Sequence, residues 1–178
     1  MTEISQHILD ILQNAKEAGA TKILLAVWED EAKDRLAFTV ADNGRGMDPQ
    51  FLARVFDPFT TTRQTRKVGL GLAMLKAVAE ACGGYVRLYS RPGKGTRLKA
   101  VFRYSHLDRP PLGDLAGSIC VFLAGARDLR LRYVHRKARR RLVFDSRAFA
   151  AEHGVTSFAE PQGFQRLLTG LQVQLHQL

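Results

Sequence analysis

The sequence predicts a two-layer α/β sandwich in which helices pack on a mixed, largely antiparallel sheet. Helical and strand-like patterns follow in the order helix, strand, strand, helix, loop, helix, strand, strand. Short polar or glycine-rich turns join the paired strand-like runs, as in hairpins. The chain has 178 residues, of which 46% are apolar and 25% charged, so it can bury a core.

The first helix is expected over residues 3–18, because apolar residues from Ile4 to Ala15 recur at helical spacing before Gly19. A second, polar stripe shares one face of this helix: Glu3, His7, Asp10, Asn14 and Glu17. The other expected elements are strands over 22–28 and 35–42, a short helix from 49 to about 56, a helix from 69 to 82, and strands over 85–90 and 96–104.

Two units are expected, residues 1–106 and residues 107–178. Paired prolines in 108–111 break regular structure and mark the boundary. The second unit is expected to be a small, basic α+β extension. Its segments are an apolar run over 112–126, strands over 129–135 and 139–145, and helices near 146–153 and 161–178.

The formal net charge of +10 permits nucleic acid, phosphate ligands or anionic membrane as partners. Residues 127–141 hold eight basic residues and one acid. Alternation there suggests a hairpin with an apolar face (Leu129, Leu131, Tyr133) and a basic one (Arg130, Arg132, His135). That face is either a solvated edge or a surface for nucleic acid or an acidic protein. Aromatic residues are few in this region, so single-stranded nucleic acid is not favoured.

Several protein classes are excluded. Cys82 and Cys120 are the only cysteines, too few for a disulfide framework or a four-ligand zinc site. The longest nearly apolar run, Leu115–Ala126, is too short to span a bilayer. The N-terminus does not resemble a signal peptide. A cytoplasmic protein with reduced thiols and no membrane span is expected.

Two polar motifs carry candidate chemistry in the first half of the chain. On the first helix, the Asn14 amide oxygen suits magnesium, and Asp10 one turn earlier can orient or deprotonate a water or hydroxyl. Asp42, at a strand end, can accept a hydrogen bond from an exocyclic amine, and Gly44 and Gly46 allow close approach to a flat ring. If they carry no such chemistry, the polar stripe of the first helix is a solvated helix face and the segment after Asp42 is a tight turn.

Two glycine motifs follow. Gly69-Leu-Gly-Leu72 opens a helix after Arg63, Arg66 and Lys67, and free amides with nearby cations suit phosphate. The motif matches neither GxxxxGK[ST] nor GxGxxG. Gly93-Lys-Gly-Thr96 alone indicates a hairpin turn.

Together and in this order, the helix stripe, DNGRGM (42–47), FDPF (56–59), VGLGLAM (68–74) and PGKGT (92–96) resemble the nucleotide-binding boxes of one superfamily. It is the GHKL superfamily of gyrase, heat-shock chaperone, histidine kinase and MutL, and the resemblance covers about residues 4–104. The first box looks most like that of MutL, whereas FDPF and GLGL look most like histidine kinases. The resemblance implies a Bergerat-type fold with ATP and Mg²⁺ as cofactors.

The resemblance also assigns expected roles. Asn14 corresponds to the magnesium ligand, with Glu17 on the same stripe, and Asp10 stands where the family often has a water-activating glutamate. Asp42 corresponds to the adenine-reading aspartate. The remaining expected binding residues are Gly44, Gly46 and Met47 at adenine, Thr96 holding adenine through water, Phe56 and Phe59 at the hinge of a lid over 60–68, Arg63, Arg66 and Lys67 at phosphate, and Gly69, Leu70, Gly71 and Leu72 at the backbone approach.

The leading hypothesis is a histidine-kinase-like ATP-binding protein that transfers the γ-phosphoryl group to a separate protein in signalling, on a histidine or serine. Two alternatives stay open: a slow MutL- or gyrase-like ATPase with lid or dimer switching, and a non-catalytic, nucleotide-dependent anti-sigma-like module. Six residues precede His7, too few for the upstream hairpin that carries the phosphoacceptor in histidine kinases. His7 itself is expected to be a half-exposed helix residue. Expected partners are ATP and an unidentified acceptor, with a homodimer left open and nucleic acid not favoured.

Overall fold

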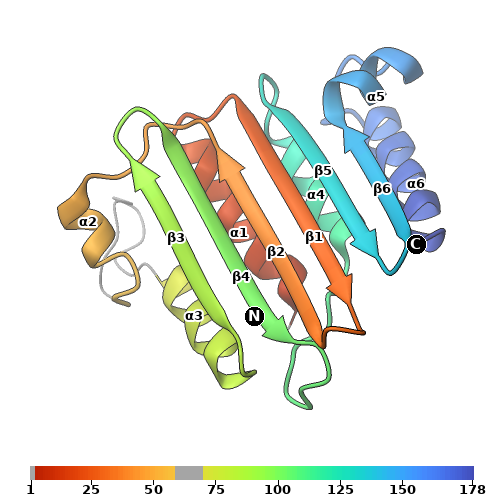
Figure 1. The fold of residues 1–178 in the computed structure, drawn as a ribbon. Coiled ribbons are helices and arrows are strands. Elements are labelled where there is room, and N and C mark those ends of the chain that lie inside the picture. Colours follow the sequence, from red (N-terminus) through yellow and green to blue (C-terminus); the bar gives the residue numbers. More distant parts are fainter. Residues whose placement is uncertain (1–2, 59–69) are drawn as a thin grey trace.

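One six-stranded mixed sheet runs through both predicted units (Figure 1). The computed structural model describes residues 3–58 and 70–178. The strand order is β3-β4-β2-β1-β5-β6, with every neighbouring pair antiparallel except β1 and β5. The strands are β1 (Lys22–Asp30), β2 (Arg35–Asp42), β3 (Tyr85–Arg91), β4 (Gly95–Arg103), β5 (Arg130–Lys137) and β6 (Arg140–Asp145).

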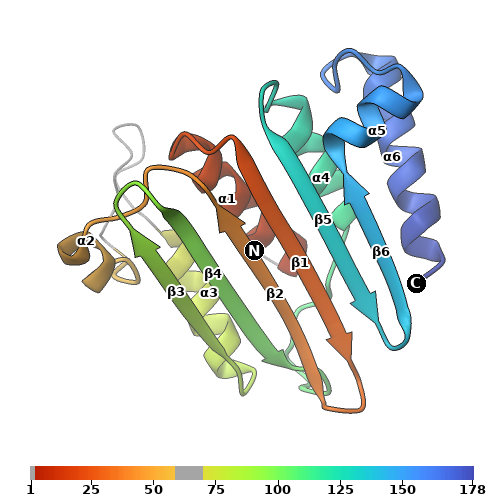
Figure 2. The same cartoon turned by 45° about the horizontal axis from the view of Figure 1, so that its top comes forward.

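Helices α1, α3, α4 and α6 cover one face of the sheet, and both views leave the other face open (Figures 1 and 2). The helices are α1 (Ile4–Glu17), α2 (Pro49–Ala53), α3 (Leu70–Ala81), α4 (Leu115–Ala124), α5 (Ser146–His153) and α6 (Pro161–His176). This arrangement confirms the predicted two-layer α/β class. Within residues 3–58 and 70–178, no helix has both the length and the apolarity needed to cross a membrane.

The helix boundaries follow from local chemistry. Ile4, Ile8 and Leu12 of α1 are fully buried on the apolar stripe, and the chain turns away at Gly19 with φ +76°. The Asp48 carboxylate caps α2 by accepting from the Phe51 amide at 2.8 Å. The regular part of α2 ends at Ala53, before the expected end near residue 56, because the chain tightens there into i→i+3 turns.

The two predicted units share one hydrophobic core. Ile4 and Ile8 of α1 belong to the same buried cluster as Ile119 and Phe122 of α4 and Leu131 of β5. Burial of this apolar surface supplies most of the driving force for folding, so each unit contributes to the stability of the other. The division at residue 106 stays a prediction, and the structure describes the two parts as continuous in sheet and core.

The second unit also supplies the acceptors for the start of α1. The Ile4 amide donates to the Pro111 carbonyl at 3.0 Å, and the Ser5 amide donates to the Leu112 carbonyl at 2.9 Å. The first amides of a helix have no partner within the helix, and no side chain caps α1. Backbone from the far side of the predicted boundary therefore satisfies them.

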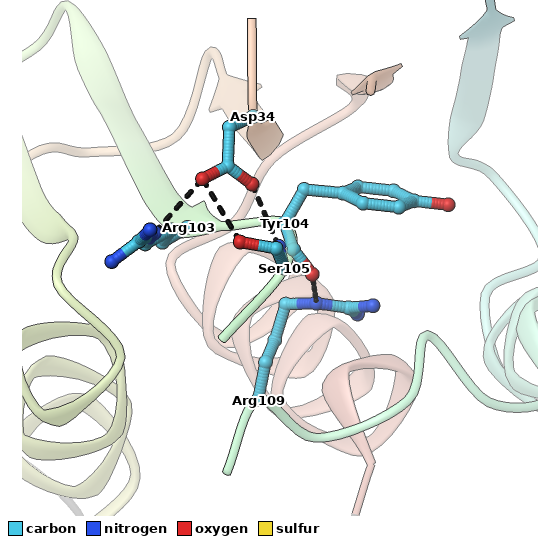
Figure 3. Close-up of polar contacts among 5 residues, drawn as sticks. All are labelled: Asp34, Arg103, Tyr104, Ser105 and Arg109. Atoms are coloured by element: carbon cyan, nitrogen blue, oxygen red, sulfur yellow. Dashed lines mark hydrogen bonds and ion pairs between the residues drawn. The ribbon is translucent and has the colours of Figure 1, made fainter. Parts of the chain in front are cut away.

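A polar cluster fixes the chain where it leaves β4 (Figure 3). The Asp34 carboxylate, in the β1–β2 turn, accepts from Arg103 Nε at 2.8 Å and from the Ser105 amide at 2.7 Å. The hydrogen bond from Arg103 contributes most to lowering the pKa of Asp34. Arg109 Nε donates to the Tyr104 carbonyl at 2.8 Å, and its guanidinium lies over the Tyr104 ring. The segment before the two prolines is thus tied to the β1–β2 hairpin.

The expected place of His135 on the basic face of the hairpin is wrong. His135 is 2% exposed, because it lies two residues after Tyr133 and so shares that residue's buried face. Tyr133 Oη lies 2.8 Å from His135 Nδ1, and His135 Nε2 lies 2.9 Å from Glu29 Oε1. Burial raises the pKa of Tyr133, so its hydroxyl stays protonated, and His135 Nε2 donates to the Glu29 carboxylate. This chain of hydrogen bonds joins β5 to β1.

His7 is also placed differently from the expectation of a half-exposed side chain. It is 1% exposed, because the buried arc of α1 is wide enough to include the position between Ile4 and Ile11. Neither ring nitrogen has a hydrogen-bond partner within the described residues. Burial lowers the pKa of His7, so the imidazole is held in its neutral form.

The buried Glu29–His135 contact predicts a pH-dependent contribution to stability. The hydrogen bond from His135 holds the pKa of Glu29 below its ordinary value of 4.5. The ionised carboxylate therefore stabilises the fold above about pH 4.5, and this contribution is lost as the pH falls through the lowered pKa. Glu29→Gln should lower the free energy of unfolding by about 1 kcal/mol at neutral pH, since a charged hydrogen bond becomes a neutral one.

Urea denaturation of the wild type and of Glu29→Gln measures this difference. It is carried out from about pH 3.5 to 8, a range that includes the ordinary carboxyl pKa values. Glu152→Gln, which neutralises an exposed acid of α5, is the matched control and should match the wild type. A difference between wild type and Glu29→Gln that stays constant down to the lowest pH would contradict the assignment.

Candidate functional site

The predicted site residues of the described chain meet at one end of the sheet. Asp42 ends β2 there, Thr96 lies at the start of β4, and the C-terminal half of α1 with Asn14 covers this region together with the start of α3. Figure 1 shows α2 beside the C-terminal end of β3, which lies at this same end of the sheet. Segments far apart in the sequence thus converge where the loop after β2 leaves the sheet.

The Asp42 carboxylate is fixed by backbone amides. Its Oδ1 accepts from the Gly44 amide at 2.8 Å and from the Thr96 amide at 3.3 Å. Its Oδ2 has no hydrogen-bond partner among the residues described. Burial raises the pKa of Asp42, and the two amide donors oppose that shift. The arrangement presents one oriented oxygen that can accept a hydrogen bond from a ligand.

The loop after β2 packs so tightly that side chains would not fit. A Cβ on Gly44 would lie 2.8 Å from the Ala18 carbonyl oxygen. Gly46 has φ +67°, and a Cβ there would overlap the Arg91 carbonyl oxygen. Both glycines of the motif are therefore required, because other parts of the backbone occupy the space that a side chain would need.

Three residues that the sequence analysis did not single out hold this loop. Ser90 Oγ accepts from the Met47 amide at 2.9 Å and lies 2.9 Å from Thr96 Oγ1. Arg45 donates from its guanidinium to the Glu17 carbonyl at 3.1 Å. Asn43 Oδ1 accepts from the amides of Thr21 and Lys22, where β1 begins. Asn43 and Arg45 lie within DNGRGM, whereas Ser90 could have been found only through its register opposite Thr96.

Helices α1 and α3 meet at the glycine motif. A Cβ on Gly71 would overlap Asp10 Oδ2, so the first turn of α3 lies directly against that carboxylate. Asn14 follows Asp10 by one turn and is half-buried, whereas Glu17 is exposed. At the start of α3, Leu70 is 46% exposed and Leu72 packs partly against the core.

The aromatic residue described from the FDPF motif contacts α3. The Lys76 ammonium lies 5.3 Å from the centroid of the Phe56 ring, a cation–π distance. Phe59, Arg63, Arg66, Lys67 and Gly69 lie outside the described residues, as does the expected lid, and their roles stay predictions. Within 3–58 and 70–178, His, Cys, Asp and Glu side chains form no group of three that could hold a metal. The role of Asn14 as a magnesium ligand stays a prediction.

The geometry agrees with a known family. A family profile described as "Histidine kinase-, DNA gyrase B-, and HSP90-like ATPase" matches residues 2–106. The chain belongs to this ATPase family. The match ends five residues before Pro111, whose carbonyl accepts from α1, so the second unit lies outside it.

The relatives that contain a similar ATPase domain are longer proteins. The chain is 37% identical over 98 residues to the phytochrome-like protein Cph1 of Synechocystis, covering 53% of this chain and 13% of that protein. It is 47% identical over 89 residues to the sensor protein kinase FleS of Pseudomonas aeruginosa, covering 50% of this chain and 22% of that protein. The chain thus spans well under a third of either relative.

A solved structure supports the fold beyond the ATPase profile. The N-terminal domain of a DNA repair protein superposes with a TM-score of 0.54 at 12% identity, covering 80% of this chain and 52% of that one. Residues 1–106 make up only about three fifths of the chain, so this likeness extends into the second unit. At this identity the likeness concerns the fold alone.

The glycine packing predicts a difference between two glycines of similar conformation. Gly46 and Gly93 have φ +67° and +70°, but only Gly46 faces a backbone oxygen, whereas Gly93 faces open space. Gly93→Ala should cost about 1–2 kcal/mol for the left-handed backbone alone. Gly46→Ala should cost clearly more, because the Arg91 carbonyl must move. Chemical denaturation of both variants measures this, and equal losses would mean that the loop is not closely packed in solution.

Proposed function

We propose that this chain binds Mg²⁺-ATP at the described site and transfers the γ-phosphoryl group to a separate protein in signalling. The observation that carries the proposal is the Asp42 carboxylate, which two backbone amides hold by one oxygen while the other oxygen remains available. Membership in the histidine-kinase-like ATPase family supports nucleotide binding. The sensor kinases among the relatives support a signalling role.

The adenine would lie against the loop after β2. Its exocyclic amine would donate to Asp42 Oδ2, and the ring would lie against the loop whose path Gly44 and Gly46 allow. Met47 would line the pocket, held by the hydrogen bond from its amide to Ser90. Thr96 would complete the adenine contacts through its hydroxyl, which pairs with Ser90. The residues present fit a flat base with an amino group.

Asn14 would hold the magnesium ion, because an amide oxygen is a suitable neutral ligand for it, and Glu17 lies on the same helix stripe. When bound, the ion neutralises charge on the phosphates. The phosphates would meet the first amides of α3 around Leu70, Gly71 and Leu72, where the helix dipole favours anions. Arg63, Arg66, Lys67 and Gly69 are the proposed contacts from the segment before α3, with Phe56 and Phe59 at its base.

Asp10 would orient the attacking group. Its carboxylate lies against Gly71 at the start of α3, and from there it can accept a proton from a hydroxyl, an imidazole or a water. Positioning and charge stabilisation contribute more to phosphoryl transfer than covalent help from the protein. The same contact also supports the second candidate function, slow hydrolysis of ATP. A cytoplasmic location, where ATP is available, fits both functions.

Asp42→Ala should weaken ATP binding at least tenfold, since a hydrogen bond to a charged group is worth about 1.5–3 kcal/mol. Calorimetric titration measures this, with Asp108→Ala, an exposed acid beyond the C-terminal end of β4 and so at the other end of the sheet, as the control. Burial raises the pKa of Asp42 above 3.8, so this carboxylate takes up a proton at a higher pH than an ordinary one. On acidification, the affinity of the wild type for ATP should therefore begin to fall at a higher pH than an ordinary carboxylate would give. Affinity within a few-fold of wild type in Asp42→Ala would remove the pocket assignment.

The fate of the γ-phosphate separates the candidate reactions. The protein would be incubated with γ-labelled ATP and magnesium, alone and with host lysate, alongside Asp10→Asn and Asp42→Ala. We expect label on a separate protein with the wild type, at least about 100-fold less with Asp10→Asn, and unchanged ATP binding in that variant. Acid or alkali lability of the label distinguishes histidine from serine. Release of free phosphate would favour the ATPase, and intact bound ATP would leave a nucleotide-dependent binding module, so either result contradicts the kinase proposal.

A further inference from the structure

The face of the sheet opposite the helices is open and basic. Alternation places one set of side chains of every strand on this side, and Figures 1 and 2 show no helix across it. We call it the open face. Its cations come from strands on both sides of the predicted boundary at residue 106: Arg87, Arg97, Lys99, Arg132, Arg136 and Arg141.

These six cations have no acidic partner within the described part of the chain. The two acids on the same face are already paired. Asp30 Oδ2 lies 3.6 Å from Lys33 Nζ, and Asp145 Oδ2 lies 2.7 Å from Arg130 Nη2. Asp145 also stands in register opposite Arg132, but its carboxylate is bound by Arg130, so most of the positive charge on this face is not compensated. A solvated face could carry such charges, but it would not need to place them against one another.

Like charges lie directly opposite each other on neighbouring strands. Arg87 of β3 pairs in register with Lys99 of β4, and Arg136 of β5 pairs with Arg141 of β6. Like charges at such positions destabilise a sheet. An anion bound across the strands would remove this cost, so the arrangement is suited to a ligand with many negative charges.

Aromatic rings lie among the cations. Tyr89 is 61% exposed and lies opposite Arg97. The Tyr85 ring has the Arg87 guanidinium carbon 4.8 Å from its centroid, and Trp28 lies in register beside Arg136. Tyr133 of β5 and Phe144 of β6, the aromatic residues of the two basic strands, are buried instead. The structure thus supplies from other strands the stacking surfaces that the basic segment lacks.

We propose that the open face binds single-stranded nucleic acid. Arginine pairs with phosphate through two parallel hydrogen bonds, and bases stack on exposed tyrosine or tryptophan rings. An acidic protein would need the cations but not the exposed rings. A duplex groove admits a helix or a two-stranded ribbon, whereas this sheet is about five strand spacings, or roughly 24 Å, wide. The ATP site lies on the helix side, so this proposal is independent of the proposed function.

The full-length protein would be titrated into fluorescent oligonucleotides of about 16 nucleotides, the upper site size for small single-strand binders. The test variant is Arg87→Glu with Arg136→Glu, which places each new carboxylate opposite a cation and so should keep or raise stability. The matched control is Arg127→Glu with Arg166→Glu, which changes the net charge equally at exposed positions off the sheet. Melting temperatures verify that all variants fold.

We expect the test variant to bind at least about tenfold more weakly and to lower the salt slope by about 1.4, the value for two lost phosphate contacts, while the control stays within about threefold. Tyr89→Ala should weaken single-strand binding about fivefold or more, and Tyr89→Phe should not. Asp42→Ala should bind the oligonucleotide as the wild type does, which separates this proposal from the ATP site.

Three results would overturn the proposal. One is no binding at about 100 µM protein, the weak limit of non-specific nucleic-acid binding. The second is equal displacement by poly-glutamate of the same length, which would indicate an acidic protein partner. The third is duplex binding as tight as single-strand binding together with no effect of Tyr89→Ala.

Discussion

The parallel pairing of β1 with β5 is the contact on which the rest of the molecule depends. It runs from Lys22 opposite Arg130 to Glu29 opposite Lys137 and makes β1 an interior strand. Without it, β1 would be an edge with unpaired backbone groups. With it, the core beneath the ATPase sheet and the core beneath the extension become one, and the basic strands of both parts lie side by side on the open face.

The parts of the fold that local sequence controls could be predicted closely, and those that tertiary packing controls could not. Strand and helix positions followed from periodicity, turns and caps such as Asp48. His7 was misjudged because a second polar stripe does not reveal how wide the buried arc is. His135 was misjudged because its polar character suggested an exposed position, although strict alternation places it on the buried face of Tyr133. Ser90 could not be found, because its role arises only from its register opposite Thr96.

The two sides of the sheet differ in the chemistry they present. On the helix side, the oriented oxygen of Asp42 and the two close-packed glycines of the neighbouring loop form a small, mostly backbone surface with fixed positions. On the open side, long cationic side chains form a broad surface with few fixed contacts. The first suits recognition of one small molecule, and the second suits a polymer whose charges repeat.

The hydrogen bonds from Ile4 and Ser5 to the carbonyls of Pro111 and Leu112 use only main-chain atoms. Such bonds impose the path of the backbone and leave almost no trace in residue identity, because nearly any side chain could stand at those positions. The family match itself ends at residue 106, before the point where the first helix is held. A fragment that ends where the similarity ends would leave two amides of the first helix without acceptors and would expose the long edge of β1. If such a fragment were insoluble, the cause would be the position of the cut and not a weakness of the ATPase fold.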